Sequence, residues 1–188
     1  MFVELFLNIF LNNVDTLMLS HYNENDVGSV GNANQVMFFL ILMFNIIATA
    51  TSIVVAQYLG AKQYQKMNTI YSLSFIFNLV LGVTLSGLFV LSKNAIMSLI
   101  NVPESMRPEA AIYMNIVGGT LFLQACYNVM LQILRCNGYA KIGMYISVAI
   151  NLINIVGNYT FLYGPLKSLN LGVAGVALST AIARLVAL

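Results

Sequence analysis

The stretch Val14-Asp15-Thr16-Leu17-Met18-Leu19-Ser20 places one carboxylate inside an apolar segment that runs from residue 1 to about residue 22. A charged side chain at the centre of a bilayer costs about 2.5–3.5 kcal/mol on insertion scales. A group that costly is expected to face a cavity or a partner, because lipid offers it no hydrogen bond. The segment therefore predicts a membrane-spanning helix in which Asp15 points away from lipid.

The composition supports a membrane protein along the whole chain. Of its 188 residues, 60% are hydrophobic and 7% are charged, and the mean hydropathy is +0.85. Soluble domains carry about 25% charged residues. Apolar stretches of about 20 residues, the length that crosses a hydrocarbon core as a helix, recur along the chain. They lack the alternation of a β-barrel strand. The sequence therefore predicts an all-α, polytopic membrane protein.

Six apolar segments separated by short polar breaks predict one six-helix transmembrane lobe over residues 1–188. The segments lie at about residues 1–22, 30–59, 68–91, 109–134, 142–163 and 172–188. The second is long for one crossing, so its ends are expected to project or tilt. The first starts abruptly and the last is still apolar at Leu188, so we expect a lobe that is truncated at both ends.

Basic residues predict the orientation of the lobe. Lys62 and Lys66 follow the second segment, and Arg135 and Lys141 follow the fourth. The opposite loops are acidic after the first segment and mixed in charge after the third, and the loop after the fifth carries Lys167 alone. The positive-inside rule then places these two loops and the N-terminus in the cytoplasm, with the chain in the cell membrane.

Amide side chains form a stripe on the fifth segment. Asn151, Asn154 and Asn158 have the spacing i, i+3, i+7, so they share one face of a helix, and Asn12 stands beside Asp15 in the first segment in the same way. Amides both donate and accept hydrogen bonds, so the stripe could line a cavity for a cation, a water chain or a polar ligand. The alternative is helix–helix packing, where such bonds contribute about 0.6–2 kcal/mol each. Three amides in register favour the polar cavity.

Other polar residues at membrane depth are weaker candidates for lining that cavity. Gln35 in the second segment and Asn128 in the fourth are as consistent with helix packing as with a ligand site. The chain has no glycine-rich phosphate loop, metal-ligand cluster or nucleophile–base pair. These absences argue against an enzyme or an ATP-driven pump, and no cofactor is expected. The net charge of +2 and the lack of a basic cluster give no indication of nucleic acid.

Five stretches together carry a family likeness along nearly the whole chain. They are Asn13-Val14-Asp15-Thr16-Leu17-Met18-Leu19-Ser20, Gly31-Asn32-Ala33-Asn34-Gln35, residues 48–61 (ATATSIVVAQYLGA), Asn154-Ile155-Val156-Gly157-Asn158-Tyr159, and residues 171–184 (LGVAGVALSTAIAR). In this order they resemble the N-terminal half of the multidrug and toxic compound extrusion (MATE) family of cation-coupled efflux transporters.

The resemblance implies two six-helix bundles that alternate in access and exchange H⁺ or Na⁺ for drugs or organic cations. The family's cation-coupling positions match Asp15, Asn154 and Asn158, and a hydroxyl position on its sixth helix matches Thr180. One branch of the family has an aspartate where this chain has Asn158, so Asp15 would titrate without a second acid there. A sodium ion would bind Asp15 with the oxygens of Asn154, Asn158 and Asn12.

The same resemblance implies the partners. These are membrane lipid, a small-molecule drug or organic cation, and a missing C-terminal lobe. Two alternatives remain open. A lipid-linked precursor flippase of related architecture would need several basic residues in its cavity, and Arg184 is the single one in or near a helix core. The other is a non-transporting membrane fragment.

Overall fold

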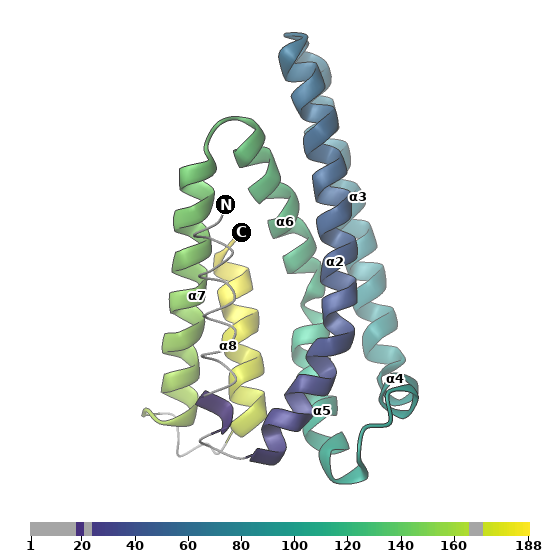
Figure 1. The fold of residues 1–188 in the computed structure, drawn as a ribbon, viewed down its shortest axis with the longest axis vertical. Helices are drawn as coiled ribbons and strands as arrows, with labels where there is room; N and C mark the ends of the chain where they lie inside the picture. Colours follow the sequence, from purple (N-terminus) through teal and green to yellow (C-terminus); the bar gives the residue numbers. More distant parts are fainter. Residues whose placement is uncertain (1–17, 21–23, 166–170) are drawn as a thin grey trace.

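The computed structural model describes residues 18–20, 24–165 and 171–188. All regular elements in these ranges are helical and most run along a common axis (Figure 1). In chain order they are α2 (Glu24–Gly60), α3 (Tyr64–Leu91), α4 (Lys93–Leu99), the 3₁₀ turn η1 (Glu104–Met106), α5 (Arg107–Tyr113), the π-helix η2 (Met114–Gly118), α6 (Leu121–Cys136), α7 (Ala140–Leu162) and α8 (Gly172–Val186).

Membrane-spanning length is reached by three of the described helices. They cover Val27–Gly60, Tyr64–Leu91 and Ala140–Leu162, and the bent pair Glu104–Gly118 and Leu121–Cys136 can form a fourth, broken span. Gly172–Val186 is apolar but shorter. These helices confirm the predicted all-α, polytopic fold class.

The α2–α3 hairpin projects beyond the other helices at one end of the bundle (Figure 1). Helix α2 has 37 residues, which corresponds to about 55 Å at 1.5 Å per residue. A hydrocarbon core is about 30 Å thick, so α2 is longer than one straight crossing requires. The sequence predicts the start of this segment near residue 30, and the helix begins earlier, at Glu24.

The fourth apolar segment is broken where the sequence suggested one helix over residues 109–134. Helix α5 continues into η2, which ends at Gly118, and α6 begins at Leu121. The part that ends at Gly118 and the part that begins at Leu121 are bent by 43° relative to each other. The hydroxyl of Thr120 donates to the carbonyls of Ile116 at 2.9 Å and Val117 at 3.1 Å. Adjacent glycines and a π-turn are recognised causes of such kinks. Here Gly118 and Gly119 precede the hydroxyl that holds the bent turn.

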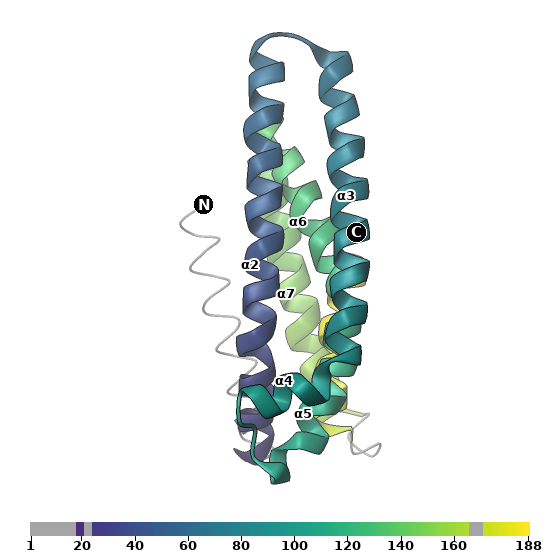
Figure 2. The same cartoon turned by 90° about the vertical axis from the view of Figure 1, so that its right-hand side faces the viewer.

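Helix α4 lies across the bundle rather than along it (Figure 2). It follows Leu91, whose side chain is 83% exposed, and ends at Leu99, which is 82% exposed, while Met97 is buried. A short helix with apolar residues on its outer side suits the interface between lipid and water.

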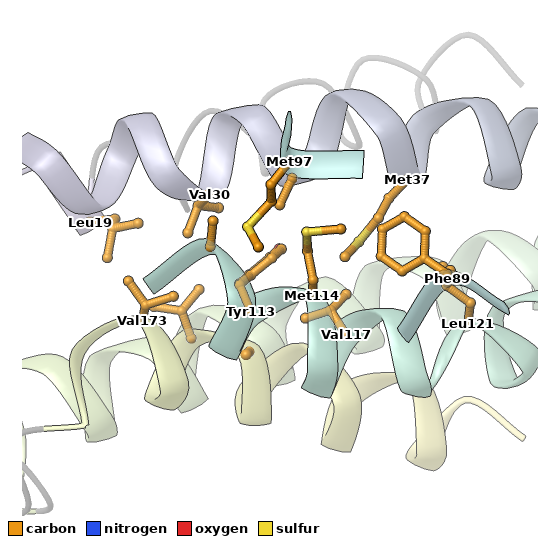
Figure 3. Packing of buried hydrophobic residues seen from close by; sticks show 14 of the residues in the cluster. Leu19, Val30, Met37, Phe89, Met97, Tyr113, Met114, Val117, Leu121 and Val173 are labelled. Carbon is orange, nitrogen blue, oxygen red and sulfur yellow. The ribbon is translucent and has the colours of Figure 1, made fainter. Parts of the chain in front are cut away.

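The main apolar core surrounds the π-helix. Met114 and Val117 are fully buried, and Met37 of α2, Met97 of α4 and Val173 of α8 join the same cluster (Figure 3). Figure 3 shows η2 between α2 and α8, with its side chains directed into the cluster. The π-helix is therefore held by packing on several sides, and the helix that follows the break has a fixed direction.

Candidate functional site

The amide stripe of α7 lies on the buried side of that helix. The side chain of Asn154 is 8% exposed, that of Asn158 is 0% exposed, and Ser147 is buried on the same face. The amide nitrogen of Asn158 donates to Oδ1 of Asn154 at 3.4 Å. The spacing of these residues thus produces a run of polar groups inside the bundle, as the helical period requires.

Two hydroxyl residues of α8 meet this stripe. The amide nitrogen of Asn154 donates to Oγ1 of Thr180 at 3.1 Å, and the hydroxyl of Ser179 donates to the backbone carbonyl of Asn154 at 2.8 Å. We call Asn154, Asn158, Ser179 and Thr180 the amide–hydroxyl cluster. Ser179 and Thr180 thus connect α8 to Asn154 of α7, and Asn158 donates to the same Asn154 side chain.

Gly157 makes this close approach of α7 and α8 possible. A Cβ atom at residue 157 would overlap the side chain of Ser179. Polar contacts between membrane helices depend on such small residues, because only they let two backbones come close. The sequence therefore specifies the polar groups of the cluster and also the glycine that lets them come within hydrogen-bonding distance.

The chemistry of the cluster suits a cation better than a redox or hydrolytic reaction. Amide and hydroxyl oxygens are neutral acceptors, and they can hold Na⁺ or a protonated group without adding charge to the membrane. Within the described residues, no group of three or more His, Cys, Asp or Glu side chains could hold a metal ion. The negative charge that such a site needs would come from elsewhere in the chain, and the predicted Asp15 lies outside the described residues.

The other predicted cavity residues lie apart from the cluster or cannot be placed. Asn151 is on the same helix, half-buried, and donates to the carbonyl of Ser147 at 2.7 Å. Gln35 is exposed on α2. Asn12 is outside the described residues, like Asp15. The structure thus brings Asn154, Asn158 and Thr180 together and leaves Gln35 on another helix.

Asn128 occupies a second polar position, in α6. Its side chain is 5% exposed and its Oδ1 accepts from the amide of Gln124 at 2.9 Å. The two residues are one turn apart on the same helix, so this hydrogen bond does not connect helices. No hydrogen bond described in the structure joins Asn128 to the amide–hydroxyl cluster.

The spacing patterns of the sequence do not indicate Ser179 or Tyr127 as polar partners. The hydroxyl of Tyr127 in α6 and that of Ser147 in α7 are 2.8 Å apart, which links the start of the stripe to the broken span. No spacing rule along one helix predicts a contact between two helices. The feature of the sequence that indicates such a contact is Tyr127 itself, because a tyrosine at membrane depth needs a hydrogen-bond partner for its hydroxyl.

Comparison with known proteins identifies the family. The family model described as MatE matches residues 1–160. The chain belongs to the MatE family. This confirms the resemblance in the sequence to the multidrug and toxic compound extrusion transporters, which are not enzymes.

Curated MatE relatives are similar over most of this chain. The uncharacterized transporter YisQ of Bacillus subtilis (strain 168) is 35% identical over 187 residues, which is 100% of this chain and 41% of YisQ. The probable multidrug resistance protein NorM of Acinetobacter baylyi is 27% identical over 169 residues, 90% of this chain and 37% of NorM. The chain thus spans about two-fifths of the length of these relatives.

Solved structures of transporters share the fold. A crystal structure of MATE in complex with MaD3S superposes with a TM-score of 0.91 at 24% identity, over 100% of this chain and 41% of that chain. A MOP superfamily transporter from Pyrococcus furiosus superposes with a TM-score of 0.90 at 23% identity, over 98% of this chain and 40% of that chain. At this identity the likeness concerns the fold alone.

Proposed function

We propose that this chain supplies the cation-coupling helices of a secondary antiporter that exports drugs or organic cations in exchange for H⁺ or Na⁺. The observation that supports this proposal is the amide–hydroxyl cluster, in which Asn154 and Asn158 lie buried against Thr180. A run of buried amides inside a membrane lobe is costly unless it has partners or a ligand. The names of the relatives, with multidrug resistance among them, favour drug export over a lipid-linked flippase.

In this proposal the coupling cation binds between Asp15 and the cluster. The ion would neutralise the carboxylate, while oxygens of Asn154, Asn158 and Thr180 replace part of its hydration shell. Binding would then favour one arrangement of the helices, and release would favour another, because a ligand shifts a conformational equilibrium only by its differential affinity. Alternating access also requires a second lobe against which this one can move.

The proposed orientation places the N-terminus in the cytoplasm of a cell-membrane protein. Lys62 lies between α2 and α3, and Lys66 is in the first turn of α3. This connection and the one between α6 and α7, which precedes Lys141, lie at the same end of the bundle (Figure 1). The first turn of α2, with Glu24 and Asp26, lies at the other end. The end with Glu24 and Asp26 also carries basic residues at the starts of α4 and α5. The positive-inside rule counts only Lys and Arg, and it favours the first end for the cytoplasm by a small margin.

The test compares two buried asparagines. Asn154→Leu removes an amide of the cluster. Asn78→Leu removes a buried amide of α3, whose nitrogen donates to the carbonyl of Ser74 in its own helix. The full-length protein would be expressed in cells that lack other drug efflux, and ethidium efflux would be measured under imposed Na⁺ and pH gradients. We expect Asn154→Leu and Asp15→Asn to lose at least tenfold in cation-driven efflux, and Asn78→Leu to retain it. Cation-driven efflux of wild-type rate in Asn154→Leu would disprove the proposed site.

A further inference from the structure

Arg184 places a positive charge in the last turn of α8, inside an apolar helix. It lies twelve residues after the start of α8 at Gly172, about 18 Å along the helix, and a hydrocarbon core is about 30 Å thick. Its side chain is half-buried, next to Ala183, which is 2% exposed. An ionisable side chain at this depth is costly and commonly has a functional role.

The guanidinium contacts the π-helix of the broken span. Its Nη1 donates to the carbonyl of Val117 at 3.2 Å, the same carbonyl that accepts from the hydroxyl of Thr120 at 3.1 Å. This contact gives one N–H group a partner and holds the charge on the side of α8 that faces η2. A guanidinium carries five N–H donors and keeps its charge under all physiological conditions.

The carboxylates of the described helices lie far from this charge along the chain. Glu24 and Asp26 are in the first turn of α2, and Glu109 is in the first turn of α5. Of the other elements packed against α8, the described η2, α6 and α7 contain no Asp or Glu, and their basic residues, Arg135 and Lys141, stand at helix ends. None of the described elements packed against α8 thus carries an Asp or Glu beyond its first turn.

Thr180 of the amide–hydroxyl cluster is one helical turn from Arg184. Residues four apart on a helix are neighbours on one face, about 5–6 Å between their Cβ atoms. Two unit charges about 10 Å apart, in a medium with an effective dielectric constant near 20, repel one another enough to change a binding constant on the order of tenfold.

We propose that Arg184 sets the affinity of the amide–hydroxyl cluster for the coupling cation, by placing a fixed positive charge one turn beyond Thr180. This inference rests on the proposed function. The repulsion weakens cation binding, so that the ion is released during each transport cycle. The result is a site that pairs a neutral set of oxygen ligands with a nearby charge that opposes tight binding.

A purely structural role for Arg184 predicts the opposite sign. If the guanidinium only holds α8 against Val117, its removal loosens the cluster and weakens cation binding. If its charge opposes the cation, a neutral residue at this position strengthens cation binding. The direction of the change therefore separates the two roles.

The experiment uses neutral and charged substitutions in the full-length protein. Arg184→Gln and Arg184→Met remove the charge, and Arg184→Lys keeps it. Arg107→Gln is the matched control, because Arg107 also donates to a backbone carbonyl, that of Val102 at 3.1 Å, but lies at the start of α5. Ethidium efflux is measured in membrane vesicles as a function of Na⁺ concentration and, separately, of pH.

We expect both neutral variants to reach half-maximal efflux at an about tenfold lower concentration of the driving cation. Arg184→Lys and Arg107→Gln should stay within about twofold of the wild type. An unchanged or higher half-maximal concentration in a folded neutral variant would overturn the inference, and Arg184→Met serves if Arg184→Gln fails to fold. If the wild type shows no cation dependence at all, the proposed function fails. If Asn154→Leu abolishes that dependence and the neutral variants do not shift it, only the role of Arg184 fails.

Discussion

The hydroxyl of Thr180 accepts a hydrogen bond from the amide of Asn154 at 3.1 Å and donates to the carbonyl of Val176 at 3.0 Å. One hydroxyl thus joins the side chain of α7 to the backbone of α8. Because a hydroxyl has a single proton, its lone pairs remain the part of the group that can accept from Asn154 or bind a cation. The orientation of the Asn154 amide therefore depends on Thr180 as well as on Asn158, which donates to its Oδ1 at 3.4 Å.

Thr180→Val should weaken cation-driven efflux. Valine keeps the shape of threonine but cannot accept from Asn154, and a lost hydrogen bond between buried groups costs about 1 kcal/mol. We expect a roughly fivefold rise in the concentration of the driving cation at half-maximal efflux, measured in vesicles. Thr84→Val is the control, because Thr84 is exposed on α3 and donates only to the carbonyl of Val80. Equal effects of the two substitutions would contradict a specific role for Thr180.

Gly82→Ala should destabilise the contact between α3 and α6. A Cβ at residue 82 would lie 2.8 Å from Cα of Phe122, an atom that cannot move without its backbone. Overpacking of this kind costs about 1–3 kcal/mol. The measurement is thermal unfolding in detergent, followed by circular dichroism.

Gly87→Ala in the same helix is the matched control for Gly82. Nothing lies within 4 Å of a Cβ placed there, and alanine is the better helix former. We expect this variant to unfold at the wild-type temperature or above. A similar loss of stability in both variants would mean that the contact of Gly82 with Phe122 is not what selects glycine.

Tyr127→Phe should loosen the link between the broken span and α7. The substitution removes the hydroxyl that lies 2.8 Å from Oγ of Ser147, and such bonds between membrane helices are worth about 0.6–2 kcal/mol. A lower unfolding temperature is expected. Tyr139→Phe, at a side chain that is 56% exposed, should leave the unfolding temperature unchanged, and an equal decrease there would point to a general effect of tyrosine loss.

Helix periodicity accounts for what the sequence could predict. The spacing of Asn154 and Asn158 placed both amides on one face, and the structure buries that face. The partner on α8 could not be predicted in the same way, because the rotation of one helix relative to another depends on packing. Thr180 was found through the family resemblance, while the adjacent Ser179 contributes a second hydrogen bond that no pattern along α8 indicated.

The break in the fourth span shows the same limit. Gly118 and Gly119 precede it, but Gly157 lies inside α7 without interrupting that helix. A glycine therefore permits a break and does not by itself produce one. Tertiary contacts determine whether the helix breaks at this position. Met114 is fully buried in the core around the π-helix, and the hydroxyl of Thr120 donates to the carbonyls of the bent turn. Neither contact is visible in a hydropathy pattern.

Asn78→Leu should leave the lobe as stable as the wild type or make it more stable. The side chain of Asn78 is 0% exposed, and its Oδ1 has no hydrogen-bond partner within the described residues. Leaving a buried acceptor unsatisfied costs about 1–3 kcal/mol, and replacing it with an apolar group of similar size removes that cost. The loss of the amide's bond to Ser74 offsets part of the gain. Thermal unfolding in detergent should therefore show an equal or higher midpoint for Asn78→Leu. A marked decrease for Asn78→Leu would instead indicate that a buried water satisfies its Oδ1, since such waters are costly to remove.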